Sequence, residues 1–275
     1  MEVKEVIGNR RTIRFYLPHR PVERDKVEKM LEAARRASCV GNVNNTKAVV
    51  IWREEASPEV MRAITPPLGY QQMQTAPCFI LWYNDTAAYE IDHWIETLKG
   101  LAVQRRIGID PEATKRQIDQ NLRPAFSASW RQAAVAPLAF MDVGQAIAQA
   151  TLIAFDEGLG TCCMSSPRIE QMGPLIGLPE TAIPVCLMSV GYPAESFEAG
   201  GQTQKAPFES LFSEMKQGQP FVRNPAVEEE LKAARLIQEP APLPWRDAEL
   251  AYVQRALQLE ERPAGAGLAP AAQRS

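Results

Sequence analysis

Histidine is scarce in this sequence, and its scarcity excludes two common kinds of active site. The 275 residues contain only His19, which follows Pro18, and His93, which lies in a helical run. We therefore expect neither a histidine-based metal centre nor a Ser-His-Asp triad, and we predict no metal ion. No pair of carboxylates spaced for acid–base catalysis is evident either.

Cysteines are few and do not form a recognisable framework. Their number is odd, most of them lie within apolar runs, and their spacing is not that of paired metal ligands. The five are Cys39, Cys78, Cys162, Cys163 and Cys186. This pattern favours buried, reduced thiols over disulfides or a structural metal site.

An excess of positive charge is also lacking. Lys and Arg number 30 against 33 Asp and Glu, giving a net charge of −3 and a pI near 5.7. This balance argues against a nucleic-acid or anionic-membrane partner. Residues 1–5 contain no apolar region, and we expect no run long enough to span a bilayer. A cytoplasmic location is the expectation.

The remaining composition is that of a globular protein. With 45% hydrophobic and 23% charged residues, the chain can bury a substantial core and form one large domain or two.

A basic stretch at residues 9–15 stands out. On an extended chain its side chains alternate between two sides, Arg10, Thr12 and Arg14 on one and Arg11, Ile13 and Phe15 on the other. Guanidinium forks and a hydroxyl on one side form a suitable site for a phosphate. The alternative is a solvated basic edge strand that discourages aggregation.

Periodicity predicts the main elements. We expect helices at 24–37, 86–121 with a break at 108–111, 138–155, 227–237 and 247–259, and strands at 47–52, 78–83 and 183–192. Residues 162–166 form a strand or extended loop. A stiff linker covers 239–244.

The helix at 138–155 is apolar nearly all round, apart from a narrow stripe of Asp142, Gln145, Gln149 and Asp156. Such a helix is buried in a large core or between subunits. The glycines that follow, in Gly158-Leu159-Gly160-Thr161, form either a turn or a close approach of backbone to a ligand.

Two groups of side chains leave alternatives open. Three asparagines at 42, 44 and 45 serve turn chemistry or hydrogen-bond a flat heterocycle. Four aromatics in or near the helical stretch form either a lid over a substrate or a satellite core: Tyr89, Trp94, Phe126 and Trp130.

The order of these signals resembles the nitroreductase family of FMN-dependent oxidoreductases. The motifs are Arg10-Arg11-Thr12-Ile13-Arg14-Phe15, Glu32-Ala33-Ala34-Arg35-Arg36-Ala37-Ser38, Gly41-Asn42-Val43-Asn44, Ala76-Pro77, Gly158-Leu159-Gly160-Thr161-Cys162, Val190-Gly191-Tyr192-Pro193 and Lys205-Ala206-Pro207. The resemblance covers roughly residues 1–84 and 137–212.

The resemblance implies an α+β fold, a three-layer sandwich with a central mixed, mostly antiparallel sheet flanked by helices. It also implies an intertwined homodimer with FMN at the subunit interface and the helix at 138–155 as its central helix. The expected organisation is an FMN-binding domain at 1–215 with a helical insertion at about 86–136, a helical extension at 216–262 and a disordered tail at 263–275.

The resemblance further implies a set of cofactor-binding residues. Arg10, Thr12 and Arg14 match positions that hold the FMN phosphate and ribityl chain, and Lys205 matches a basic position that reaches the same phosphate. Asn42 and Asn44 match positions that contact the flavin ring, and 163–166 matches a segment whose backbone lies against it. The whole predicted set is Arg10, Arg11, Thr12, Arg14, Asn42, Asn44, Cys163, Met164, Ser165, Ser166 and Lys205.

The implied activity is transfer of hydride from NAD(P)H through FMN to a small acceptor, such as a nitroaromatic or a quinone, with no catalytic side chain of its own. Two alternatives stay open: an FMN-dependent oxidase or dehydrogenase that uses oxygen, and a flavin-binding dimer without turnover. The sequence departs from the family at Ser38-Cys39, often Pro-Ser, and at Asn44-Asn45-Thr46, often Gln-Pro-Trp. These departures concern the substrate side.

Overall fold

The sheet at the centre of the molecule has four antiparallel strands. The computed structural model describes residues 2–66, 70–165 and 169–259. In this part of the chain the strands are β1 (Thr46–Trp52), β2 (Cys78–Asp85), β3 (Gly160–Ser165) and β4 (Ala182–Gly191), in the order β1-β2-β4-β3. Parallel pairing occurs at two isolated bridges, one between Thr12 and Thr161 of β3 and one between Gln202 and Pro240.

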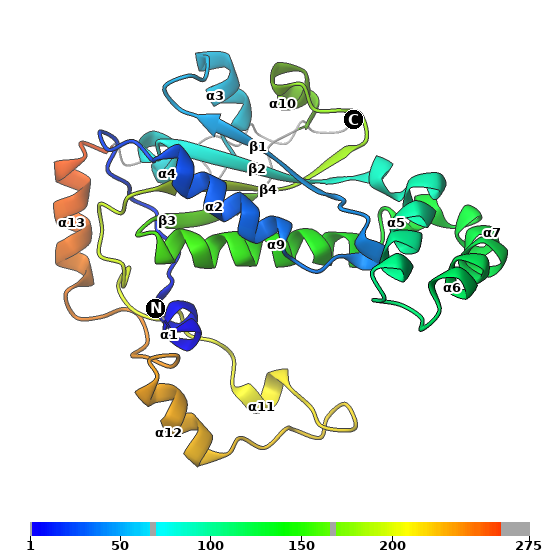
Figure 1. Cartoon of the computed structure of the whole chain (residues 1–275). Coiled ribbons are helices and arrows are strands. Elements are labelled where there is room, and N and C mark those ends of the chain that lie inside the picture. Colours follow the sequence, from blue (N-terminus) through cyan, green and yellow to red (C-terminus); the bar gives the residue numbers. More distant parts are fainter. Residues whose placement is uncertain (1, 67–69, 166–168, 260–275) are drawn as a thin grey trace, which may run out of the picture.

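Helices cover both faces of the sheet, which makes three layers (Figure 1). On one face α2 (Arg24–Arg35) and α9 (Pro137–Asp156) pack on alternate side chains of β2 and β4. On the other face lie α3 (Pro58–Ile64), α4 (Tyr70–Thr75) and α10 (Ile169–Ile176). Because both faces are covered, β2 is apolar nearly throughout, as its sequence predicted. The predicted α+β sandwich is confirmed.

Helix α9 is the main support of the sheet, and it corrects one expectation. It has 20 residues with a mean hydropathy of 1.4 in its most apolar window, so it is long and apolar enough to cross a membrane. The expectation of no such run was therefore wrong. Here α9 packs on α2 and on the strands, with Val143, Ala146 and Ala150 in the core. It is the core helix of a globular fold.

The polar stripe expected on α9 does not form a solvent-facing strip along its whole length. Asp142 is only 2% exposed. Its carboxylate accepts a hydrogen bond of 3.1 Å from the backbone N–H of Val40. The helix thus uses this polar group to hold a loop, because a buried carboxylate needs a donor.

Between β2 and α9 the chain forms a helical segment, residues 86–136, at one end of the sheet (Figure 1). Its elements are η2 (Thr86–Tyr89), α5 (Ile91–Val103), α6 (Pro111–Gln117), η3 (Ile118–Leu122), α7 (Arg123–Ser127) and α8 (Trp130–Ala133). The predicted break at 108–111 is present. Asp110 caps α6 by accepting from the N–H groups of Glu112 and Ala113.

The first helix, α1 (Val3–Asn9), packs below the sheet against the segment around α12 (Pro225–Ala233) (Figure 1). The other elements of the C-terminal part are α11 (Phe208–Leu211) and α13 (Arg246–Ala256). A short helix, η1 (Val40–Asn42), lies between α2 and β1. The predicted helix at 227–237 ends at Ala233, because Arg235 takes a left-handed conformation with φ 59°. Residues 235–236 then pass directly over Gly8. The tail expected at 263–275 lies outside the described residues.

Replacing Gly8 with Ala tests this packing. An added Cβ would collide with the backbone at Arg235 and Leu236. We expect Gly8→Ala to loosen residues 235–238, seen as faster proteolytic cleavage there and a lower melting temperature. Gly100→Ala is the control, since a Cβ at that helical position meets nothing within 4 Å. Equal behaviour of the two variants would contradict this packing.

Candidate cofactor site

The basic segment is held in place by two uncharged side chains. Ile13 is 1% exposed and Tyr16 is fully buried. The N–H of Ile13 donates to the carbonyl of Thr161 at 3.0 Å, and the Tyr16 hydroxyl bonds Ser189 Oγ at 2.9 Å. At Gly160 a Cβ would lie 2.6 Å from Ile13 Cγ1, so this glycine permits the close approach.

The alternation predicted for this segment is present. Arg11 and Ile13 are buried, Thr12 is partly exposed and Arg14 is exposed. Arg10, Arg11 and Thr12 line a hollow of about 810 Å³. Lys205 and Arg223 contribute two further cations to its lining. No Asp or Glu of the described chain lines this hollow, which we call the basic hollow. Its other walls are apolar or amide side chains, including Ile7, Gln204, Phe208, Phe212 and Ile237.

Arg11 forms ties within the protein. Its Nε donates to the carbonyl of Gly201 at 3.1 Å and one terminal nitrogen donates to Gln238 Oε1 at 3.0 Å. The other terminal nitrogen donates to the carbonyls of Gly8 and Arg10. Burial, and to a lesser degree the nearby Arg10, lower the pKa of this guanidinium. Arg11 therefore joins the N-terminal and C-terminal segments behind the basic hollow.

A buried carboxylate fixes the next residues of the segment. Glu195, whose side chain is 1% exposed, accepts from the backbone N–H groups of Arg14 at 2.6 Å and Phe15 at 3.1 Å. Its second oxygen accepts from Arg246 of α13 at 2.6 Å, and Arg246 also pairs with Glu249 at 2.6 Å. The C-terminal helix is thereby tied to the basic segment.

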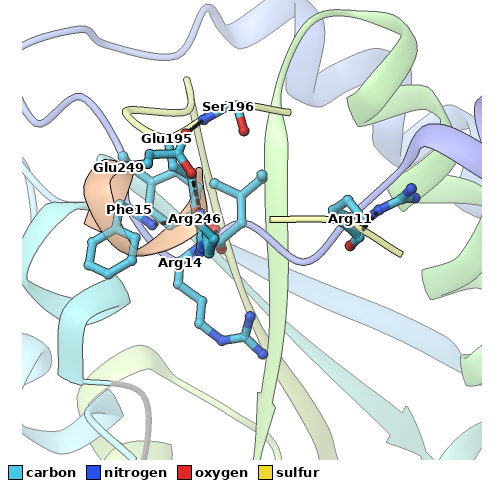
Figure 2. A network of polar contacts seen from close by, with 10 residues as sticks. Arg11, Arg14, Phe15, Glu195, Ser196, Arg246 and Glu249 are labelled. Atoms are coloured by element: carbon cyan, nitrogen blue, oxygen red, sulfur yellow. Dashed lines mark hydrogen bonds and ion pairs between the residues drawn. The ribbon is translucent and has the colours of Figure 1, made fainter. Parts of the chain in front are cut away.

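Figure 2 shows the directions that these contacts give to the arginine side chains of the basic segment. Arg11 and Arg14 point away from each other, and Arg14 does not line the basic hollow. Of the residues predicted for the phosphate, the structure therefore brings Arg10, Arg11, Thr12 and Lys205 to one hollow. Arg14 does not line it.

The asparagine loop, residues 40–45, lies elsewhere. Asn42 and Asn44 have φ values of 56° and 57°, and Asn44 Nδ2 donates to the carbonyl of Asn42 at 2.7 Å. Left-handed backbone is where asparagine is favoured among non-glycine residues, so turn chemistry accounts for both. Asn45 Nδ2 donates to the carbonyl of Ala139 at 3.0 Å, which fixes the loop to the first turn of α9.

Within one chain, the asparagine loop and the basic hollow lie toward opposite ends of α9. The loop is bonded to Ala139 and Asp142, whereas the basic segment pairs with Thr161, beyond the other end of the helix. At 1.5 Å per residue, the stretch from Asp142 to Asp156 alone is about 21 Å long. Asn44 instead lines a separate hollow of about 350 Å³ with Cys39 and Trp82.

The predicted ring segment lies on β3. Cys163 and Ser165 are exposed on the same face of the sheet as α9, while Met164 points into the opposite core. Ser166 lies outside the described residues. β3 is the edge strand beside β4. Among the described residues, the backbone pairing on its outer side is the bridge between Thr161 and Thr12.

The four aromatics fill a core inside the helical segment. Tyr89 and Trp94 are 1% and 6% exposed. Trp94 stacks on Phe126 with ring centres 4.3 Å apart and meets Tyr89 edge-on at 5.5 Å. Trp130 packs against the same cluster. These contacts support the satellite-core interpretation rather than the lid. Trp94 also supports the asparagine loop, because a Cβ on Gly41 would lie 2.5 Å from its Nε1.

Comparison with known proteins decides the family. A model of the nitroreductase family matches residues 7–105 and 115–192, well over half of the sequence. The chain belongs to the nitroreductase family. The expected class, an FMN oxidoreductase enzyme, is confirmed at this level. The match includes most of the helical segment that we expected to be an insertion, and it stops before Lys205.

Individual relatives agree with the family assignment. The chain is 25% identical over 200 residues to the CLA biosynthesis enone reductase of Lactiplantibacillus plantarum, covering 70% of this chain and 87% of that protein. It is 28% identical over 213 residues to an NADH dehydrogenase of Thermus thermophilus, covering 77% and 95%. A structure described as a nitroreductase in complex with FMN, from Exiguobacterium sibiricum, superposes with a TM-score of 0.61 at 22% identity, covering 78% and 97%.

Several residues around the site were not found from the sequence. Glu195, Gln238 and Arg246 tie the basic segment to the C-terminal segment, and Arg223 lines the basic hollow. No local pattern marks them, because each partner lies far away in the sequence.

Replacing Trp94 tests whether this side chain belongs to a core or to a substrate lid. We expect Trp94→Ala to lower the free energy of unfolding by about 3–5 kcal/mol, since it empties a packed aromatic site. The more exposed Trp130→Ala should cost less. Chemical denaturation measures both. A variant at Trp94 with unchanged stability and altered kinetics toward the acceptor alone would restore the lid interpretation.

Asp142 gives a pH-dependent prediction. Burial raises the pKa of its carboxyl, partly offset by the N–H of Val40. The folded protein therefore holds this proton more tightly than the unfolded chain, so the stability of the native protein falls as pH rises from about 4 to the raised pKa. Asp142→Asn keeps an acceptor for Val40 and removes this titration. The difference between the melting temperatures of Asp142→Asn and the native protein should therefore shift in favour of the variant as pH rises through this window. Above the raised pKa the difference should stay constant.

Asp119 provides the control of opposite sign. Lys99 lowers the pKa of its carboxyl, so Asp119→Asn should not gain in stability as pH rises. If Asp142→Asn tracks the native protein at every pH, the carboxylate carries no burial cost.

Proposed function

We propose that this chain is an FMN-dependent oxidoreductase that reduces a small acceptor with electrons from NADH or NADPH. The observation that carries the proposal is the basic hollow, where Arg10, Thr12 and Lys205 converge without a carboxylate among the described lining residues. Family membership supplies the cofactor class.

The donor set fits a phosphate. A guanidinium gives a fork of N–H donors, an ammonium gives a mobile charge, and a hydroxyl gives one further donor. Arg10 is available for this role because Arg11, its neighbour, makes the ties behind the basic hollow. With a volume of about 810 Å³, the basic hollow also has room for the chain that joins phosphate to ring.

The ring end of the cofactor would lie along β3. The backbone at Cys163–Ser165 belongs to an edge strand, and edge strands present unpaired N–H groups on their open side. FMN, when bound, supplies the hydride chemistry. The residues of this chain bind its phosphate, orient its ring and direct positive charge and N–H groups toward it.

We further propose that the complete site needs two copies of the chain. The asparagine loop lies about 20 Å along α9 from the basic segment, so one chain does not bring both groups to one cofactor. A second copy packed against α9 would bring its asparagine loop to the cofactor held by the first. Part of the outward side of α9 is apolar and exposed: Met141 is 50% exposed, and Gly144 and Ala148 are exposed between it and Leu152. Small residues there permit close packing of a second helix.

For the acceptor, we propose a small conjugated compound, such as a nitroaromatic, a quinone or an α,β-unsaturated ketone. The similarity to an enone reductase supports the last of these. The burial of Tyr89 and Trp94 removes the aromatic lid as an argument for an aromatic acceptor. A cytoplasmic location fits free thiols and a pyridine-nucleotide donor.

Removing Arg10 tests the phosphate site. We expect Arg10→Ala to weaken FMN binding by roughly tenfold to a hundredfold, since a hydrogen bond to a charged group contributes about 1.5–3 kcal/mol. Lys205→Ala should have a similar effect. Arg62→Ala, an exposed arginine on α3, is the control. Fluorescence titration of FMN gives the dissociation constants. Unchanged affinity in both site variants would show that the phosphate lies elsewhere.

A charge on the outer side of α9 tests the dimer. We expect Ala148→Glu to give a folded monomer that retains little flavin, because a C2 interface would bury the charge twice. Ala150 is unsuitable for this purpose, since it is fully buried in the core of its own chain. Ala128→Glu, at an exposed position of the helical segment, is the control. A dimeric Ala148→Glu protein in sedimentation would exclude α9 from the interface.

A further inference from the structure

Two free thiols lie side by side at the open edge of the sheet. In the pairing of β3 with β4, Cys163 is opposite Met188 and Ser165 is opposite Cys186. Residues opposite each other in an antiparallel pair share a face, and so do alternate residues of one strand. Cys163 and Cys186 are therefore diagonal neighbours on the face that carries α9. Both are free thiols.

The two thiols differ in exposure and in charge environment. Cys163 is exposed, whereas Cys186 is 8% exposed. The neighbouring thiol of Cys186, aided by the charge of Arg10, lowers the pKa of Cys163. Cys163 and burial in turn raise the pKa of Cys186. Cys163 is thus the more acidic thiol of the pair, and Cys186 keeps its proton to higher pH.

We propose that Cys163 and Cys186 form a redox-active dithiol, in which exposed Cys163 reacts with a hydroperoxide and neighbouring Cys186 then closes a disulfide with it. An accessible thiolate beside a second thiol is the arrangement that reacts selectively with oxidants. The family assignment and the proposed flavin reaction give these cysteines no such role.

The reaction balances in two steps. The Cys163 thiolate attacks one oxygen of the hydroperoxide, R–O–O–H. The O–O bond breaks, and after protonation of the leaving oxygen the products are Cys163–SOH and R–OH. The thiol of Cys186 then attacks the sulfur of Cys163–SOH, which releases water and forms the Cys163–Cys186 disulfide. The peroxide is reduced by two electrons and the dithiol is oxidised by two.

The position of β3 permits this closure. A disulfide needs sulfur atoms about 2.05 Å apart, so the two free thiols must approach each other for the bond to form. β3 is the edge strand and is bonded along its length to β4 alone among the described strands, so a local adjustment of β3 that brings the two sulfurs together disturbs this one ladder.

The other cysteines lack these features. Cys162 points to the opposite face, where Gln72 Nε2 donates to its sulfur at 3.3 Å, and burial raises its pKa. Burial raises the pKa of Cys78 to about 12 and also raises that of Cys39. Cys162 is a matched control, because it is next to Cys163 in the sequence but lies on the opposite face of the sheet and is buried.

The experiment treats the purified, reduced protein with one equivalent of hydrogen peroxide and counts its thiols. We expect the five thiols to fall to three, the intact mass to drop by two hydrogen atoms and one peptide pair to join Cys163 to Cys186. The rate should follow a single ionisation with a midpoint below the ordinary cysteine value of about 8.5. The thiol count and the mass do not depend on flavin, and flavin content is read separately from absorbance, so this proposal and the proposed function can fail independently.

Three variants decide the roles. Cys186→Ser should stop at Cys163–SOH, trapped by dimedone. Cys163→Ser should lose the reaction, with a rate at least roughly tenfold lower because its thiolate is gone. Cys162→Ser should behave as the native protein. Five thiols remaining after peroxide, an unchanged rate in Cys163→Ser, or a disulfide that involves Cys39, Cys78 or Cys162 would overturn the proposal.

Discussion

The place of the basic segment in the fold depends on the burial of Ile13 and Tyr16. These side chains enter the core on one face of the sheet, and their backbones bond β3 and the end of β4. Because side chains alternate along an extended chain, burying Ile13 forces Thr12 outward. The glycines at 160 and 191 leave the space that Ile13 and Tyr16 occupy. A charged site is thus positioned by apolar packing, which is rigid and independent of salt.

The C-terminal segment holds the basic segment from its other side. Arg11 reaches Gln238, and Glu195 reaches Arg246, each across a large separation in sequence. Glu195 is nearly fully buried, yet each of its oxygens accepts a hydrogen bond, which offsets the loss of hydration. The residues after 192, which the family model does not match, therefore contribute both Lys205 and these ties to the site.

Much of this could be predicted from the sequence. The periodicity of 24–37 predicted α2, which ends two residues earlier, and the alternation at 10–15 predicted which side chains point outward. What could not be predicted depends on distant partners. Arg11 has the same side chain as Arg10. Its structural role comes from its hydrogen bonds to Gln238 and to the carbonyls of Gly8 and Gly201, which link distant segments of the chain. Likewise, the choice between a lid and a core for Trp94 depends on its contacts with Tyr89 and Phe126, which come together only in the folded chain.

The central claim is that one chain binds the phosphate and a second copy completes the site around the ring. The most direct measurement is a crystal structure of the protein with FMN. The account predicts the phosphate within hydrogen-bond distance of Arg10 and Lys205 of one chain, the ring against Cys163–Ser165 of that chain, and the asparagine loop of a second copy beside it. A phosphate bound outside the basic hollow, or a ring enclosed by a single chain, would contradict the account.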